Sequence, residues 1–133
     1  MELERAVFRF VEHELYSYDL LADQLAALKD DIYSGRPAEG ARPESNRRPG
    51  NPTEAKGIRL VSDVAVLHIT RTIQAIDVGL SRLTDDHRTI FDLKYRRAYD
   101  WIAVCEAMPI SRSAYYKLRR ELVEMVAYQL GLI

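Results

Sequence analysis

Polar and basic side chains gather between residues 111 and 120. At 100° per residue most of them share one helix face, opposite Tyr115 and Leu122. Arginine can pair with O6 and N7 of guanine, and lysine, serine and tyrosine can hold phosphates. The segment predicts a DNA-binding surface, and an ordinary solvated helix is the alternative. The candidate contact residues are Ser111, Arg112, Ser113, Tyr116, Lys117, Arg119 and Arg120.

The remaining reactive residue types do not form a catalytic pattern. His13, His68 and His87 are scattered over three predicted elements, without the spacing of a ligand pair. The sequence has no glycine-rich phosphate loop and no nucleophile motif. The single cysteine, Cys105, excludes an internal disulfide and a cysteine-rich zinc site. We therefore expect no catalytic residue, no metal, no cofactor and no enzymatic activity.

The elements that position residues 111–120 are a short helix, a turn and a longer helix. The apolar face of the short helix predicts Trp101, Val104, Cys105 and Met108 as buried, with Cys105 as a packing thiol. Pro109 should end this helix, and Ser111 should cap the next one. Apolar residues at steps of three and four predict the buried face of the second helix: Tyr115, Leu118, Leu122, Val126 and Leu130.

A further short helix is expected just before this pair. Thr84 is its predicted N-cap, with Asp85 and Asp86 in the first turn, where the helix dipole favours anions. It should end near Arg97, and Asp100 should cap the helix that follows. Residues 84–133 are thus predicted to form one helical domain.

Two long helices are predicted upstream. Residues 1–33 carry a helical apolar period without glycine or proline, with a seam at 18, 21, 25, 28 and 32. Residues 58–83 carry a heptad seam at 66, 69, 73, 76, 80 and 83. The seams can pack on each other as an antiparallel hairpin, or on another subunit. Residues 34–57, rich in glycine, proline and arginine, are predicted to be a flexible linker. The predicted fold class is therefore all-α.

Charge is unevenly distributed along the 133 residues, although the net charge is only −1. Residues 1–33 carry three basic and eight acidic side chains, whereas residues 94–120 carry seven basic and two acidic ones. This asymmetry indicates a local polyanion-binding patch and an acidic remainder. Acidic residues stand where a signal peptide would have basic ones, and no apolar run is long enough to cross a membrane. We therefore expect no signal peptide and a cytoplasmic protein.

Several of these segments resemble known transcription proteins. The 104–118 spacing is similar to the helix-turn-helix pattern, with Pro109 where glycine is common, and residues 83–95 are similar to the start of region 4 of bacterial sigma-70 factors. Nearly the whole chain resembles the RinA/ArpU family of phage transcriptional regulators, through residues 5–16, 71–77 and 111–116. The resemblance implies activation of phage late or packaging genes inside a bacterial host cell.

Three functions therefore remain open. The first is a sequence-specific transcription regulator that binds double-stranded DNA. The second is the DNA-recognition small subunit of a phage packaging terminase, and the third is a helical adaptor without DNA. The acidic N-terminal helix is a candidate for contact with RNA polymerase, and the long helices are candidates for homo-oligomerisation. No membrane partner is expected.

Overall fold

The structure, a computed structural model, describes residues 3–41 and 52–133, and within these it describes side chains for residues 3–31 and 63–133. The described chain is helical and contains no strand, so the predicted all-α fold class is confirmed. The helices are α1 (Arg5–Tyr16), α2 (Tyr18–Ala41), α3 (Pro52–Ser81), α4 (Asp85–Ile90), the π-helix η2 (Phe91–Arg96), α5 (Trp101–Ala107) and α6 (Arg112–Gln129).

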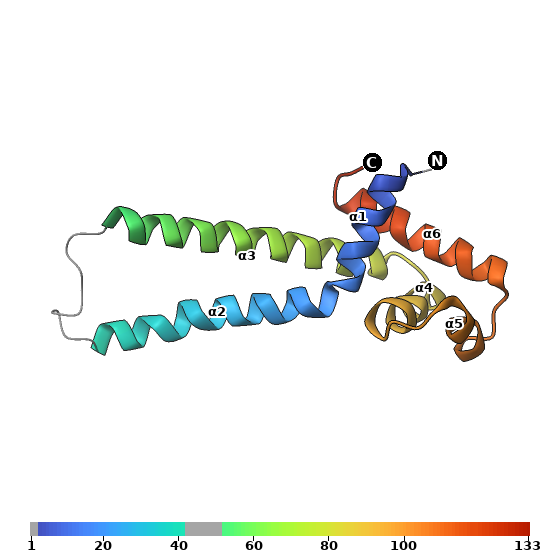
Figure 1. Cartoon of the computed structure of the whole chain (residues 1–133), viewed down its shortest axis with the longest axis horizontal. Helices are drawn as coiled ribbons and strands as arrows, with labels where there is room; N and C mark the ends of the chain where they lie inside the picture. Colours follow the sequence, from blue (N-terminus) through green and yellow to red (C-terminus); the bar gives the residue numbers. More distant parts are fainter. Residues whose placement is uncertain (1–2, 42–51) are drawn as a thin grey trace.

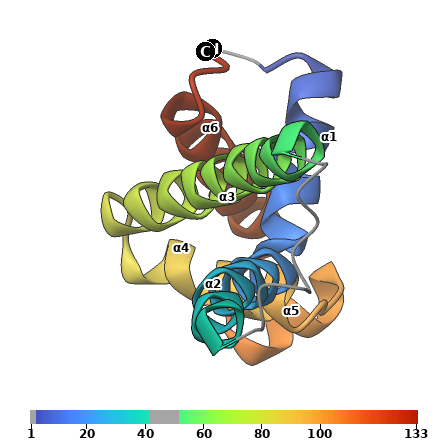
Figure 2. The same ribbon diagram turned by 90° about the vertical axis from the view of Figure 1, so that its left-hand side faces the viewer.

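Helices α2 and α3 lie side by side and antiparallel, and they extend away from a body formed by the other helices (Figure 1; Figure 2 shows the pair end-on). The predicted seam is inside this hairpin, where its described members are buried or half-buried: Tyr18, Leu21, Leu25, Leu28, Val66, Ile69, Ile73, Ile76, Leu80 and Leu83. The two long seams therefore pack within one chain.

The predicted single helix over residues 1–33 is wrong, because the chain turns at Ser17. Ser17 has φ −86° and ψ 0°, and it separates α1 from α2. α1 packs on α6 and η2, whereas α2 packs on α3. One straight helix cannot lie in both grooves, so tertiary packing, and not a helix-breaking residue, sets this break.

The predicted linker over residues 34–57 is wrong at both ends. α2 continues through Gly35 and Pro37 to Ala41, and α3 already begins at Pro52. Proline is well tolerated at the first position of a helix, where its missing N–H has no intrahelical partner. Residues 42–51 of the predicted linker lie outside the described residues.

One apolar core joins the N-terminal and C-terminal parts of the chain. Val11 and Leu15 of α1 and Ile76 of α3 are fully buried together with Leu122 and Val126 of α6. Because α6 packs on both α1 and α3, residues 84–133 share their core with the upstream helices instead of enclosing one of their own.

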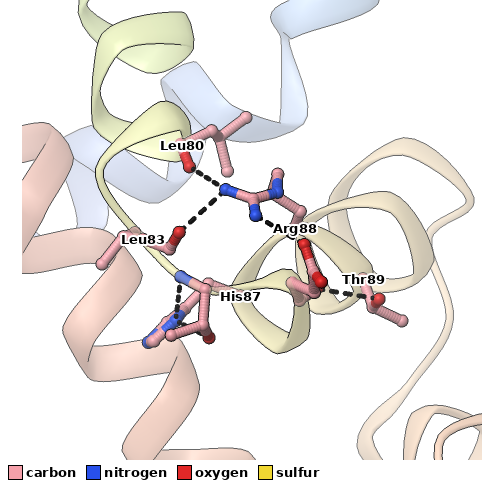
Figure 3. A network of polar contacts seen from close by, with 7 residues as sticks. Leu80, Leu83, His87, Arg88 and Thr89 are labelled. Carbon is pink, nitrogen blue, oxygen red and sulfur yellow. Dashed lines mark hydrogen bonds and ion pairs between the residues drawn. The ribbon is translucent and has the colours of Figure 1, made fainter.

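Arg88 closes the end of α3 where the chain turns into α4. Its Nη1 donates to the carbonyl oxygens of Leu80 and Leu83, each at 2.8 Å, and its Nη2 pairs with Asp85 (Figure 3). The last carbonyls of a helix lack the N–H donor four residues later, so the guanidinium supplies a donor to Leu80 and to Leu83 in the connection. This contact fixes the direction in which α4 leaves α3.

His87 anchors the start of α4 on α6. Its Nδ1 accepts from the backbone N–H of Thr84 at 3.2 Å and lies 2.7 Å from the Thr84 hydroxyl, while its Nε2 lies 3.0 Å from Oε1 of Glu121. Thr84 is the N-cap of α4, as predicted. A histidine in place of the usual glutamate thus completes the capping box, and it also ties α4 to α6.

The π-helix η2 follows α4 directly and contributes three buried apolar side chains, those of Phe91, Leu93 and Tyr95, and the buried Lys94. It ends at Arg96, and Ala98, two residues later, has a φ of 58°, in the left-handed region. That conformation reverses the chain toward Asp100, which caps α5 by accepting from the N–H of Ala103 at 2.8 Å, as predicted.

No helix of the described residues is long and apolar enough to span a membrane.

Candidate nucleic-acid interface

Helix α5, a four-residue turn and helix α6 build the candidate interface. At Met108 the backbone leaves the helical region, with φ −120° and ψ 96°, as expected before Pro109. Ser111 then caps α6, because its Oγ accepts from the N–H of Ala114 at 3.1 Å. Both helix boundaries therefore agree with the sequence.

The inner side of this unit is apolar, as predicted. Val104, Met108 and Tyr115 are buried, and Cys105 is half-buried with its Sγ 3.9 Å from the carbonyl oxygen of Ser111. The same cluster includes Leu122 and Val126. The remaining predicted core residues pack against it together with Ile110 of the turn: Trp101, Leu118 and Leu130. Residues 111–120 are thus held by a fixed core beneath them.

Six of the seven candidate contact residues lie on the exposed side of α6. They are Ser111, Arg112, Ser113, Tyr116, Lys117 and Arg120. Arg120 lies 3.9 Å from Glu124 in an exposed pair, and Lys117 has no ion pair within the part of the chain that the structure describes. We call these six residues the α6 polar face.

Arg112 is held against aromatic rings at the N-terminal end of α6. Its guanidinium carbon lies 4.4 Å from the ring centroid of Trp101 and 5.6 Å from that of Tyr116. Such cation–π contacts restrict a long side chain without using its N–H groups as hydrogen-bond donors. Trp101, predicted only as a core residue, therefore also positions the first arginine of the face.

Arg119 points away from the α6 polar face. Its Nε donates to Oε2 of Glu12 at 2.9 Å, its Nη2 donates to Oε1 at 2.7 Å, and its guanidinium lies 4.9 Å from the Phe8 ring centroid. The hydrogen bonds to Glu12 raise the pKa of Arg119. Because Nε and Nη2 of Arg119 already donate to the Glu12 carboxylate, we exclude Arg119 from the predicted DNA contacts.

The other basic residues counted between 94 and 120 also have internal roles. Lys94 is buried, donates to the Tyr16 hydroxyl at 2.9 Å, and lies within 6 Å of the ring centroids of Tyr16, Tyr95 and Tyr115. Arg96 pairs with Asp19 at 3.1 Å, and Arg97 pairs with Asp92 at 3.2 Å. The basic excess available to a partner is therefore smaller than the sequence balance suggests.

The acidic N-terminal region has a structural role that the sequence did not reveal. Glu12 accepts from Arg119 and from the Tyr95 hydroxyl, the latter at 2.6 Å, and Asp19 accepts from Arg96. Burial and the neighbouring Glu12 raise the pKa of Tyr95, which keeps this hydroxyl a donor. One acidic residue of α1 and one of α2 thus pair with basic residues of the C-terminal part of the chain.

The histidines do not form a site. His13 and His68 are exposed on different helices, and His87 is occupied by the α4 cap. Among the described residues, no group of three or more histidine, cysteine or carboxylate side chains is placed to hold a metal ion.

Comparison with known proteins gives one finding. A search of curated proteins and a search of solved structures find no match. A family model described as "Protein of unknown function (DUF722)" matches residues 16–128, which include α2 to α5 and all but the last residue of α6, but only the last residue of α1. Because this match covers well over half of the sequence, the chain belongs to the DUF722 family.

Proposed function

We propose that this protein is a sequence-specific DNA-binding transcription regulator that inserts α6 into the major groove. The observation that carries the proposal is the α6 polar face. It places three cations, two hydroxyls and one tyrosine on one side of a capped helix whose opposite side is the core. Recognition helices contact bases mainly through their first turns, which here carry Arg112, Ser113 and Tyr116.

The contacts divide by chemistry. Arg112 and Arg120 are the candidates for base contacts, because a guanidinium can donate two parallel hydrogen bonds to guanine. Lys117, Ser111, Ser113 and Tyr116 suit phosphate oxygens. The resemblance to RinA/ArpU regulators and to sigma-70 region 4 agrees with this proposal. The RinA/ArpU resemblance extends the proposal to activation of phage late or packaging genes.

Binding to labelled DNA duplexes tests the proposal. Fragments selected from genomic DNA of the source, followed by footprinting, supply the target sequence. Replacing Arg112 or Arg120 by alanine should weaken binding to that target by about 1–3 kcal/mol if the arginine pairs with a base. Lys29→Ala, which removes an exposed cation of α2, is the matched control. If the Arg112→Ala, Arg120→Ala double variant binds the target as tightly as the unchanged protein, α6 is not the reading helix.

The α2–α3 hairpin supports a second candidate, the DNA-recognition small subunit of a phage packaging terminase. The hairpin extends from the body (Figure 1). It exposes Leu20, Val64 and Leu67, each 58% accessible. Exposed apolar side chains on an extended hairpin suit assembly with further copies. Native mass spectrometry separates the two: a closed ring favours the terminase subunit, and a monomer or small oligomer favours the regulator.

A further inference from the structure

A cleft of about 590 Å³ separates the N-terminal half of α1 from the middle of α6. Arg5 and Arg9 line it from α1, and Arg119 and Arg120 line it from α6. Arg120 also belongs to the α6 polar face, so the cleft opens directly beside the surface proposed to contact DNA.

The cleft carries an excess of positive charge. Its two carboxylates are already paired: Glu12 with Arg119, and Glu124 with Arg120. Arg5 and Arg9 are exposed and form no ion pair with any residue that the structure describes. Two guanidinium groups therefore remain for an external anion.

Helix stability does not account for Arg5. Arg5 is the first residue of α1, where the helix dipole favours anions and disfavours cations. The first turn of α1 contains no acidic residue. A cation placed there is better explained by a negatively charged partner outside the chain.

We propose that the α1–α6 cleft binds two backbone phosphates of the DNA duplex, one at Arg5 and one at Arg9, next to the stretch contacted by α6; this proposal rests on the function proposed above. Arginine guanidinium groups form paired, charge-assisted hydrogen bonds to phosphate oxygens. Arg120 links the two surfaces, so one strand can pass from the α6 polar face to Arg9 and Arg5.

A free nucleotide fits the cleft less well than a DNA backbone does. Phe8 is the single aromatic side chain among the lining residues, and the guanidinium of Arg119 already lies over its ring, 4.9 Å from the centroid. One face of the only aromatic ring in the cleft wall is therefore already covered. The arginines of the wall instead offer paired hydrogen bonds to phosphate oxygens.

Fluorescence anisotropy with a labelled 30-base-pair duplex of mixed sequence, between about 50 and 200 mM salt, tests the proposal. Each phosphate contact contributes about 0.9 to the slope of log affinity against log salt, so the Arg5→Ala, Arg9→Ala double variant should lose about 1.8 from the slope. Over that fourfold salt range the unchanged protein should then lose about twelvefold more affinity than the variant. Glu124→Gln should tighten binding, and Lys29→Ala should change neither quantity.

The outcomes separate this proposal from the one on which it rests. If the double variant keeps the full slope while Lys117→Ala lowers it, the cleft proposal is overturned and the DNA-binding function stands. If the unchanged protein shows no salt-dependent duplex binding, both are overturned. A rise in melting temperature with ATP that depends on Arg5 and Arg9, with duplex binding unchanged in the double variant, would assign the cleft to a free nucleotide instead.

Discussion

Arg119 of α6 and Glu12 of α1 form a two-pronged ion pair, with Nε–Oε2 at 2.9 Å and Nη2–Oε1 at 2.7 Å. The side chains are 28% and 14% exposed, so the pair is largely shielded from water. It connects the helix that carries the candidate DNA contacts to a helix that begins near the start of the chain.

Arg119→Ala should lower the free energy of unfolding by about 1.5–3 kcal/mol, because it leaves the Glu12 carboxylate partly buried without its main partner. Arg97→Ala is the matched control. Its pair with Asp92 is exposed on both sides, so the loss should stay below about 1 kcal/mol. Urea unfolding followed by circular dichroism measures both losses. Equal losses would show that the Glu12–Arg119 pair stabilises the fold no more than an exposed pair does.

Glu12 should also make stability depend on pH. Burial acts to raise the pKa of Glu12, but hydrogen bonds from Arg119 and Tyr95 and the charges of Arg119 and Lys94 outweigh it, so the pKa lies below its ordinary value of 4.5. A lowered folded-state pKa stabilises the protein above the unfolded-state pKa, and this contribution is lost as the pH falls through the folded-state value.

The difference in unfolding free energy between the unchanged protein and Glu12→Gln should therefore be constant near pH 7 and should shrink below about pH 4.5. Urea unfolding at pH 7 and pH 3 provides the measurement. A difference that does not change over this range would contradict the assigned role of the Glu12 carboxylate.

Lys94 should contribute nothing to DNA binding, although it is one of the basic residues nearest to the helix pair in the sequence. Its ammonium lies among the rings of Tyr16, Tyr95 and Tyr115 and is buried. We expect Lys94→Met to leave the salt slope of duplex binding unchanged, whereas Lys117→Ala should reduce it by about 0.9. Anisotropy titrations on correctly folded variants distinguish the two. A reduced salt slope for Lys94→Met would contradict the statement that Lys94 does not contact DNA.

Ser111 should stabilise α6 as its N-cap. Ser111→Ala removes the acceptor for the N–H of Ala114 and should cost about 1 kcal/mol of stability. Ser113→Ala, two residues later on the exposed face, should stay within about 0.5 kcal/mol. Thermal unfolding without DNA gives both values, and the cap assignment fails if the two variants unfold at the same temperature.

Ala98 should be replaceable by glycine with a gain in stability. Its φ of 58° lies in the left-handed region, which costs a residue with a Cβ about 1–2 kcal/mol. Ala98→Gly relieves this strain and should stabilise the protein by up to about 1 kcal/mol after the entropy of the unfolded glycine is counted. Ala103→Gly inside α5 should instead destabilise by about 0.5–1 kcal/mol. Urea midpoints of the two variants should move in opposite directions.

The sequence by itself determined the features that depend on neighbouring residues. Thr84, Asp100 and Ser111 begin their helices and Pro109 ends one, because capping and proline geometry act within a few residues. The heptad seams identified which faces of α2 and α3 are buried, since periodicity reports the apolar side of a helix. They left open whether the partner was another helix of the chain or another subunit.

Only the tertiary structure decided the contacts between distant residues. Glu12 and Arg119 are both charged positions that periodicity assigns to an outer face, and nothing near either one in sequence indicates the other. The break at Ser17 arises because α1 and α2 pack in different grooves, not because the residue opposes helix formation. The predicted contact surface therefore lost Arg119 and gained Trp101 as a positioning residue. A local pattern gives the face of a helix, whereas the fold decides which charges on it already have partners.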